Sequence, residues 1–264
     1  MSAFKRGITN QEFISELNKN KFWLQMVKDE DLFIAIRNEY LNVYYYGQSI
    51  CKVTFVKKQI KWMTHKKYLG IDGSGYTDTG VYLDKIEELK KIAKKHGGRE
   101  KEQVKKNILE DKKRAILDVE ITFGKEDDSG KRSIDYLAIE KDSSGKIKLV
   151  FYEAKHFDNQ EIRSRNEPKV FNQIEKYERV LNDINHKTEI IDSYKLIYEN
   201  IKALNLNNKS NLVQLIGSDS DKLEIETKPR LIIFAIDKNI DDNKHIQKLK
   251  VKFDDKRLIL MPKI

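Results

Sequence analysis

Cysteine, proline and long apolar runs are scarce in this chain. Its 264 residues include one cysteine, Cys51, and three prolines. A single cysteine excludes an intrachain disulfide, a four-cysteine zinc site and a cysteine-held iron–sulfur cluster. The five histidines are scattered, without the spacing of metal ligands. No apolar run approaches the roughly 20 residues of a membrane-spanning helix, so we expect no membrane association.

The first ten residues also lack the features of a secretion signal. They are polar and basic and contain no apolar segment of the kind that signal peptides carry. We therefore expect a cytoplasmic protein.

Positive charge is abundant. Charged residues make up 35% of the chain, hydrophobic residues 39%, and the net charge is +9. Such an excess suits a polyanionic partner such as nucleic acid. A general bias toward lysine explains the same excess equally well, so the charge alone leaves both interpretations open.

The first 98 residues predict an α+β module. Residues 1–29 carry a helical stripe of apolar residues, with Thr9 or Asn10 as the candidate N-cap. Short strands are then predicted, with short connections typical of a β-meander, at 32–36, 41–45, 50–56 and 60–64. The glycines of 70–75 lack the lysine and hydroxyl residues of a phosphate-binding loop, so a plain loop is expected. A helix over 82–95 ends at two glycines, and there we place a domain boundary.

Residues 99–264 predict a second domain of α/β class. A charged helix over 99–114 leads into three strands with short connections, expected at 116–123, 133–140 and 146–157. In the first of these strands apolar and polar residues alternate, which predicts one buried and one polar face. Two helices, at 168–182 and 183–205, precede a fully apolar strand at 230–237, and a short helix and a strand follow at 244–249 and 257–261. This order predicts an α/β sandwich whose mixed sheet takes up the 230–237 strand in parallel.

Ionisable residues stand at the ends of two neighbouring apolar strands. Glu153 and Lys155 end one strand, and Asp135 lies on the strand before it. Side chains two residues apart in a strand share a face, so Glu153 and Lys155 project side by side. Alone, such a triplet is typical of an ion pair at a strand end. Its place on an apolar strand beside Asp135 favours a metal site with an amine next to it.

These residue types suit the hydrolysis of a phosphodiester bond. A divalent cation polarises the phosphate and lowers the pKa of bound water. Mg²⁺ prefers oxygen ligands with one or two carboxylates, and Asp135, Glu153 and the carbonyl of Ala154 are suitable. Lys155 would hold the nucleophilic water or stabilise the charge of the transition state. We expect Mn²⁺ to substitute for Mg²⁺.

The spacing of these residues resembles that of a known protein family. Asp135, seventeen intervening residues and Glu153-Ala154-Lys155 resemble the signature of the PD-(D/E)xK nucleases. Gln173 and Tyr177 on the next predicted helix resemble the Q-x-x-x-Y motif of the RecB-like branch. The order of elements after residue 99 is similar to that family's α-β-β-β-α-β core. Position 134 is isoleucine instead of the proline of the family's name.

The resemblance implies a restriction-endonuclease-like fold over residues 99–240 and a role for each matching residue. Asp135 and Glu153 would bind the metal, and Lys155 would position or activate water. Gln173 would contact the metal-bound water, Lys155 or the nucleic acid. Tyr177 would orient its helix or touch the backbone, although tyrosines at helical spacing also commonly pack in cores.

A further acid is expected from the preceding helix or strand. Glu120 is the first choice as a catalytic residue and metal ligand, followed by Asp118 and Glu110. A solvated strand face accounts for Glu120 equally well. His156 follows the triplet but points to the other face, so a structural role is expected. The single cysteine, Cys51, excludes the branch of the family that carries an iron–sulfur cluster.

The resemblance thus implies a Mg²⁺-dependent nuclease that acts on DNA more than on RNA, in bacterial or mobile-element defence. Two alternatives stay open, a catalytically inactive module of this fold that binds nucleic acid or a protein, and a toxin-like RNase. A homodimer is one expected assembly. In residues 1–98, Tyr44, Tyr45 and Tyr46 among lysines predict nucleic-acid contact, and alternating burial in the sheet explains most of these tyrosines as well. A partner or oligomer surface is the main alternative to nucleic-acid contact for this part of the chain.

Overall fold

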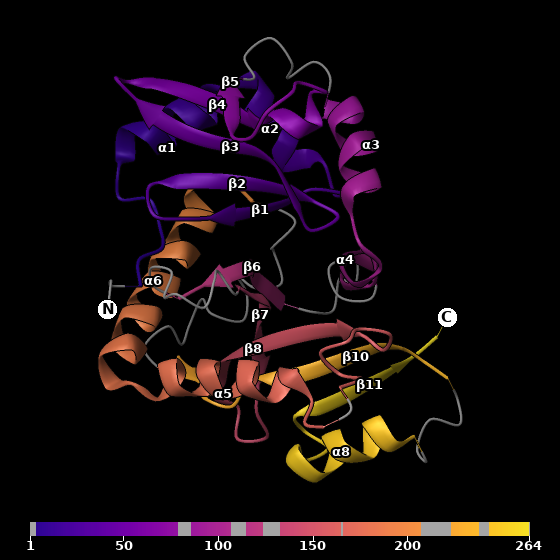
Figure 1. Ribbon diagram of the computed structural model, residues 1–264. Coiled ribbons are helices and arrows are strands. Elements are labelled where there is room, and N and C mark those ends of the chain that lie inside the picture. Colours follow the sequence, from indigo (N-terminus) through magenta and orange to yellow (C-terminus); the bar gives the residue numbers. More distant parts are fainter. Residues whose placement is uncertain are drawn as a thin grey trace.

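The computed structural model describes residues 4–78, 86–106, 115–123, 133–164, 166–206, 223–237 and 243–263. These residues form a mixed α/β protein with one antiparallel sheet and one mixed sheet. Figure 1 shows the first sheet above the second, with helix α6 running from the lower part of the molecule to the upper part. The predicted combination of a meander and a mixed sheet is confirmed.

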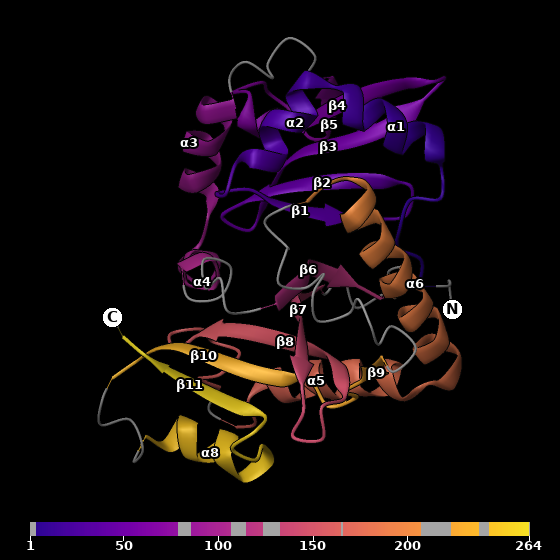
Figure 2. The same ribbon diagram turned by 180° about the vertical axis from the view of Figure 1, so that it is seen from behind.

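The first sheet is an antiparallel meander with the strands in chain order. Its strands are β1 (Phe33–Ile36), β2 (Tyr40–Tyr45), β3 (Gln48–Val56), β4 (Gln59–His65) and β5 (Tyr76–Asp78). Two helices cover one face of it (Figure 2), α1 (Gln11–Lys19) and α2 (Lys21–Lys28). The four predicted strands are confirmed. The fifth was missed because three residues after a glycine-rich loop give no periodic signal.

The helix predicted over residues 1–29 is wrong for residues 4–9, whereas the predicted N-cap Asn10 is confirmed. Asn10 is the N-cap of α1, since its side chain accepts a hydrogen bond from the amide of Phe13 at 3.1 Å. The described residues before it form no helix, and Gly7 forms a parallel bridge with Asn38. A second cap, Asn20, separates α1 from α2.

The second sheet is mixed and has the strand order β11-β10-β8-β7-β6, with the short β9 beside β8. The strands are β6 (Ala115–Thr122), β7 (Ser133–Lys141), β8 (Ile147–His156), β9 (Glu224–Ile225), β10 (Arg230–Ile236) and β11 (Leu258–Pro262). β6, β7 and β8 are antiparallel, whereas β10 runs parallel to β8 and β11 runs parallel to β10. The prediction that the 230–237 strand joins the sheet in parallel is therefore confirmed.

Five further α-helices lie among the described residues, and the first of them packs against β2 and β3 of the first sheet. They are α3 (Ile86–His96), α4 (Arg99–Val104), α5 (Lys169–Asn182), α6 (Ile184–Ala203) and α8 (Lys244–Lys252). α3 and α4 meet at the two glycines where a domain boundary was predicted. That boundary stays a prediction, and one cluster of buried apolar side chains contains residues from both sides of it.

Strand β8 is buried on both of its faces. Leu149 and Phe151 belong to the main apolar cluster with α5 and α6, whereas Val150, Tyr152 and Ala154 belong to a second cluster on the other face. Each large apolar side chain removed from water in this way stabilises the fold by about 1.5–3 kcal/mol. Because β8 is covered on both sides, ionisable groups at its end are desolvated and need partners.

Strand β6 departs from the predicted alternation. Leu117 and Ile121 lie in the main cluster, but Val119 joins Ile116 in the second cluster. A register shift between Ile116 and Asp118 inserts an extra residue, and Glu120 has φ +50°. Such a bulge reverses the side-chain alternation, so the single polar face predicted for this strand is wrong.

Asp118, a candidate acid from the sequence, is instead a buried link between the two sheets. It is 1% exposed and forms an ion pair with Arg37, which lies directly after β1. Arg37 also donates to the carbonyl of Val119 at 2.6 Å, and Tyr194 of α6 donates its hydroxyl to Asp118 at 3.1 Å. Arg6 lies 3.8 Å away on the other side. Both carboxylate oxygens of Asp118 thus have partners remote from the other candidate acids.

We expect Asp118→Ala to destabilise the protein by about 3–5 kcal/mol, because it leaves the buried Arg37 charge without its partner. Equilibrium unfolding in guanidinium chloride measures the loss. The matched control is Glu16→Ala, which breaks an exposed ion pair with Lys19 and is expected to cost about 0–1 kcal/mol. Equal, small losses for both variants would contradict the structural role of Asp118.

Candidate active site

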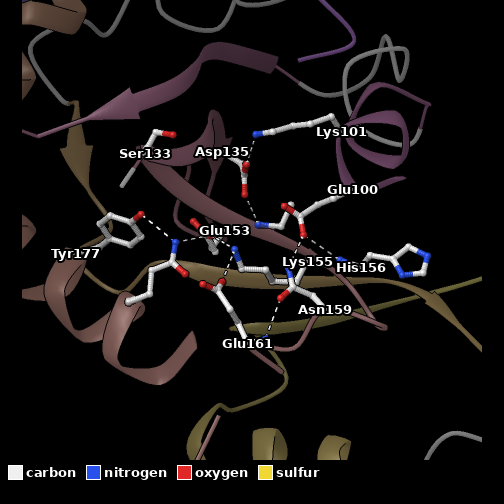
Figure 3. A network of polar contacts seen from close by, with 12 residues as sticks. Glu100, Lys101, Ser133, Asp135, Glu153, Lys155, His156, Asn159, Glu161 and Tyr177 are labelled. Carbon is white, nitrogen blue, oxygen red and sulfur yellow. Dashed lines mark hydrogen bonds and ion pairs between the residues drawn. The ribbon is translucent and has the colours of Figure 1, made fainter. Parts of the chain in front are cut away.

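The candidate residues meet at one edge of the mixed sheet. The register pairs Tyr136 of β7 with Tyr152 of β8, so the next position outward brings Asp135 beside Glu153. Helix α5 crosses the face that Glu153 shares with Phe151, and α4 approaches from the other side (Figure 3). The polar groups of this edge therefore come from elements that are distant in sequence.

Glu153, Lys155, Gln173 and Tyr177 are in contact. One oxygen of Glu153, Oε1, accepts a hydrogen bond from Nε2 of Gln173 at 2.6 Å and lies 2.7 Å from Nζ of Lys155. Gln173 also donates to the hydroxyl of Tyr177 at 3.1 Å. Lys155 has a second partner, Glu161, at 3.0 Å. The structure therefore brings together the four residues that the two sequence motifs single out.

The other oxygen of Glu153, Oε2, is buried and has no hydrogen-bond partner among the described residues. Glu153 itself is 1% exposed. Burial and then the charge of Asp135 raise the pKa of Glu153 well above its ordinary value, and the charge of Lys155 opposes them only in part. A buried carboxylate oxygen without a donor costs free energy. It is also a suitable ligand for a cation, so the ion pair with Lys155 does not account for the whole side chain.

Asp135 and Glu120 share a lysine that the sequence did not single out. Nζ of Lys101 on α4 lies 2.8 Å from Oδ1 of Asp135 and also forms an ion pair with Glu120. Oδ2 of Asp135 accepts a hydrogen bond from the amide of Ala154 at 2.7 Å, and Glu120 accepts one from the hydroxyl of Ser133 at 3.1 Å. An ammonium group thus lies between two carboxylates that were predicted to bind a metal.

Charge dominates the state of Lys101. Burial alone lowers its pKa, but the negative charges of Asp135 and Glu120 outweigh burial and raise the pKa above the ordinary lysine value. Burial also raises the pKa of Glu120, while Lys101 opposes that shift. Lys101 therefore stays protonated and offsets part of the negative charge of Asp135 and Glu120 in this arrangement.

Glu100, the neighbour of Lys101, is a second residue that sequence reasoning missed. Its carboxylate accepts hydrogen bonds from the amide of His156 at 3.2 Å and from the side chain of Asn159 at 3.1 Å (Figure 3). Its charge also helps to raise the pKa of Lys155. The signal in the sequence was the charged helix directly before the strand of Glu120. From the many charges of that helix the sequence singled out only Glu110, because no spacing distinguishes Glu100 from its neighbours.

The other residues that the sequence singled out lie in different surroundings. Asp118 lies in its own network with Arg37, and Glu110 is outside the described residues. Ala154 turns its amide toward Asp135, and because N–H and C=O of a strand residue point to the same neighbouring strand, its carbonyl faces that side too. The imidazole of His156 accepts a hydrogen bond from the amide of Asp158 at 3.1 Å and so holds the following loop.

The three tyrosines of β2 and its turn have partners within the chain. Tyr44 is 7% exposed, and its hydroxyl accepts a hydrogen bond from Arg37 at 3.2 Å. Tyr45 and Tyr46 hold the ammonium group of Lys105 over their rings at 4.5 and 4.3 Å. Internal packing, one of the two interpretations from the sequence, accounts for these contacts.

The donor set fits a divalent cation only in part as it stands. Over the ranges that the structure describes, no group of three or more histidine, cysteine, aspartate or glutamate side chains is arranged to hold a metal ion. Lys101 supplies the positive charge between Asp135 and Glu120 instead. The unpartnered oxygen of Glu153 and the carboxylate oxygens of Asp135 are nevertheless ligands of the type that Mg²⁺ prefers.

The fold and site define a mixed α/β protein with buried carboxylates and lysines at one edge of its mixed sheet. Comparison of the chain with protein-family models, curated proteins and solved structures finds no match. Among the helices described, none combines the length and apolar character that crossing a membrane requires.

Proposed function

We propose that this protein is a Mg²⁺-dependent nuclease of the PD-(D/E)xK type that hydrolyses phosphodiester bonds, in DNA more readily than in RNA. The observation that carries the proposal is the buried Glu153. One of its oxygens is paired with Lys155 and Gln173, and the other has no partner among the described residues. We extend the proposal to a role in bacterial or mobile-element defence, the setting that the family resemblance implies.

The order of elements supports the restriction-endonuclease-like core. α4, β6, β7, β8, α5 and β10 follow one another as in an α-β-β-β-α-β core, with α6 and the short β9 inserted before β10. The three antiparallel strands and the parallel β10 give the mixed sheet that the resemblance implies. The site lies at the end of β8, on the face covered by α5.

Asp135 and Glu153 would hold the cation, with the Ala154 carbonyl and Glu120 as further oxygen ligands. When bound, the cation would polarise the scissile phosphate and lower the pKa of a water molecule. Lys155 is suited to an electrostatic role. Burial lowers its pKa, but the charges of Glu153, Glu100 and Asp135 raise it above the ordinary value, so the amine stays protonated. A fixed positive charge stabilises the negative charge of a phosphoryl transition state.

The direct test is cleavage of linear and circular DNA by the full chain, with Mg²⁺ or Mn²⁺ and then with EDTA. We expect metal-dependent cleavage that falls by about 10²–10³-fold in Lys155→Ala, the loss typical of one transition-state donor. The matched control is Lys146→Ala, an exposed lysine paired with Glu224, which is expected to cleave like the wild type. Absence of metal-dependent cleavage, or equal cleavage by Lys155→Ala, would refute the proposal. Degradation of RNA with DNA spared would select the toxin-like RNase.

A second candidate function is a catalytically inactive module of the same fold that binds nucleic acid or a protein. It is favoured by one observation, the position of Lys101 between Asp135 and Glu120. Calorimetry with Mg²⁺ and Mn²⁺ separates the two functions. A nuclease site binds the ion and loses it in Asp135→Asn, whereas wild-type protein without metal binding would select the inactive module.

A further inference from the structure

A pocket lined by cationic side chains lies beside the loop that carries Glu161. It has a volume of about 450 Å³, and its described lining residues are Arg163, Lys244, His245 and Lys248. This size is within the range of about 300–1,000 Å³ that is usual for ligand sites. None of these four residues is acidic, and three of them carry a permanent positive charge.

The topology places this pocket at the same sheet edge as Glu153 and Lys155. β8 and β10 are parallel neighbours, so their carboxyl ends meet at one edge. Arg163 belongs to the loop after β8, and α8, with the other lining residues, begins shortly after β10. α8 lies on the same side of the sheet as α5 (Figures 1 and 2).

Side-chain contacts tie the pocket wall to the candidate active site. Nζ of Lys248 donates a hydrogen bond to the carbonyl of Asn166 at 2.6 Å, which holds α8 against the loop after β8. In the same loop Glu161 pairs with Lys155 at 3.0 Å. Arg163, two residues further, rests over the ring of Phe157 at 4.6 Å. One short loop therefore carries both a partner of the candidate catalytic lysine and a wall of the pocket.

Beside the pocket, two cationic side chains share one carboxylate. Arg163 lies 3.3 Å from Asp158, a carboxylate that is also 3.8 Å from Arg99. Lys244 and Lys248 are one helical turn apart on one face of α8, where like charges repel. Burial, followed by the charges of Lys244, Lys248 and Arg163, lowers the pKa of the intervening His245. The three cationic side chains around this imidazole give a positive local potential, which attracts an anion.

We propose that this pocket binds a phosphate group of the nucleic-acid backbone and holds the strand against the edge that carries Glu153 and Lys155. Arg163 supplies a planar fork for phosphate oxygens, and Lys244 and Lys248 supply point charges. Lys244 is also the first residue of α8, where the helix dipole favours a negative group. The inference rests on and deepens the proposed function, since it adds a contact for the substrate beside the same site.

The test measures DNA binding without cleavage. The full chain in EDTA is titrated against a fluorescent DNA duplex at several salt concentrations, and fluorescence anisotropy gives Kd. We expect the double variant Lys244→Gln/Lys248→Gln to lower the slope of log Kd against log salt by about 1, the change for the one phosphate that the pocket neutralises. The control is Lys250→Gln/Lys256→Gln, which removes the same charge from two exposed positions outside the pocket.

A weaker salt dependence confined to the pocket variant supports the proposal. Equal changes in both double variants would mean that only the overall charge matters, and this would overturn it. Titration with inorganic phosphate forms a second arm. If the pocket variant loses phosphate binding but binds DNA like the wild type, the occupant is a small anion and the proposal fails. Pocket-dependent DNA binding without metal-dependent cleavage would refute the proposed nuclease while leaving this inference standing.

Discussion

Glu153→Gln is expected to abolish metal-dependent cleavage while making the metal-free protein more stable. Replacing a residue that hydrogen-bonds to a metal ligand commonly costs about 10–100-fold in metal affinity or activity. Loss of a direct ligand should therefore cost at least roughly 100-fold. The gain in stability has a separate cause. Burial and the charge of Asp135 raise the pKa of Glu153, which means that the folded protein disfavours its charged form. A neutral amide of the same shape removes this cost.

The stability gain has a defined pH dependence. A carboxyl group whose pKa is raised on folding binds its proton more tightly in the folded state, so the charged form weakens folding above the folded pKa. This penalty shrinks as the pH falls through the folded pKa toward the ordinary value of 4.5. In EDTA, Tm of Glu153→Gln should therefore exceed that of the wild type by roughly 2–4 °C for each kcal/mol relieved. The difference should narrow on acidification.

The control for stability is Glu161→Gln. This change also removes a carboxylate from Lys155, but Glu161 is 36% exposed and its loss relieves no buried charge. We expect no increase in Tm from it. If Glu153→Gln lowered Tm in EDTA at every pH, or cleaved DNA like the wild type, Glu153 would be the structural ion-pair partner of Lys155 and no metal ligand.

Lys101→Met is expected to raise the affinity for Mg²⁺ and to make folding depend on the ion. The ammonium group lies 2.8 Å from the Asp135 oxygen that faces it and also pairs with Glu120, so it competes with a divalent cation for these carboxylates. Methionine keeps the apolar stem without the charge. Without metal, the two carboxylates then repel each other. Removing the lysine from this buried ion pair lowers the stability of the fold by about 3–5 kcal/mol at most.

Calorimetry and thermal unfolding measure both effects of Lys101→Met. We expect roughly tenfold tighter Mg²⁺ binding, which corresponds to about 1.4 kcal/mol of removed competition, and a lowered Tm that Mg²⁺ restores. Lys106→Met is the control, because Lys106 lies just beyond α4 and pairs with Glu102 on the exposed side. Unchanged or weaker Mg²⁺ binding in Lys101→Met would show that Lys101 does not compete for the ion.

Local periodicity predicted the parts of the site that lie on single elements. The two-residue repeat of a strand put Glu153 beside Lys155, and their charged atoms are 2.7 Å apart. The helical repeat put Gln173 beside Tyr177, and they share a hydrogen bond of 3.1 Å. Both results follow because the direction of a side chain is fixed by the backbone of its own element.

The choice between Asp118 and Glu120 could not be made from alternation. The register shift before Asp118 and the positive φ of Glu120 send the two acids to different partners, Arg37 for the first and Lys101 for the second. A bulge depends on how a strand fits its neighbours, and these residues carry no glycine or proline to signal it. The sequence pattern therefore predicted one polar face where the fold has two environments.

By itself, the sequence determined most of the elements, the mixed sheet and the triplet at the end of β8. Only the tertiary structure decided which charges neutralise one another. Lys101 reaches Asp135 across 34 positions of the chain, and Arg37 reaches Asp118 across 81. The physical reason is that periodicity records burial along one element, whereas an ion pair requires two elements to pack so that desolvated charges meet. Packing also left one oxygen of Glu153 without a partner among the described residues, and the proposed metal site depends on that oxygen.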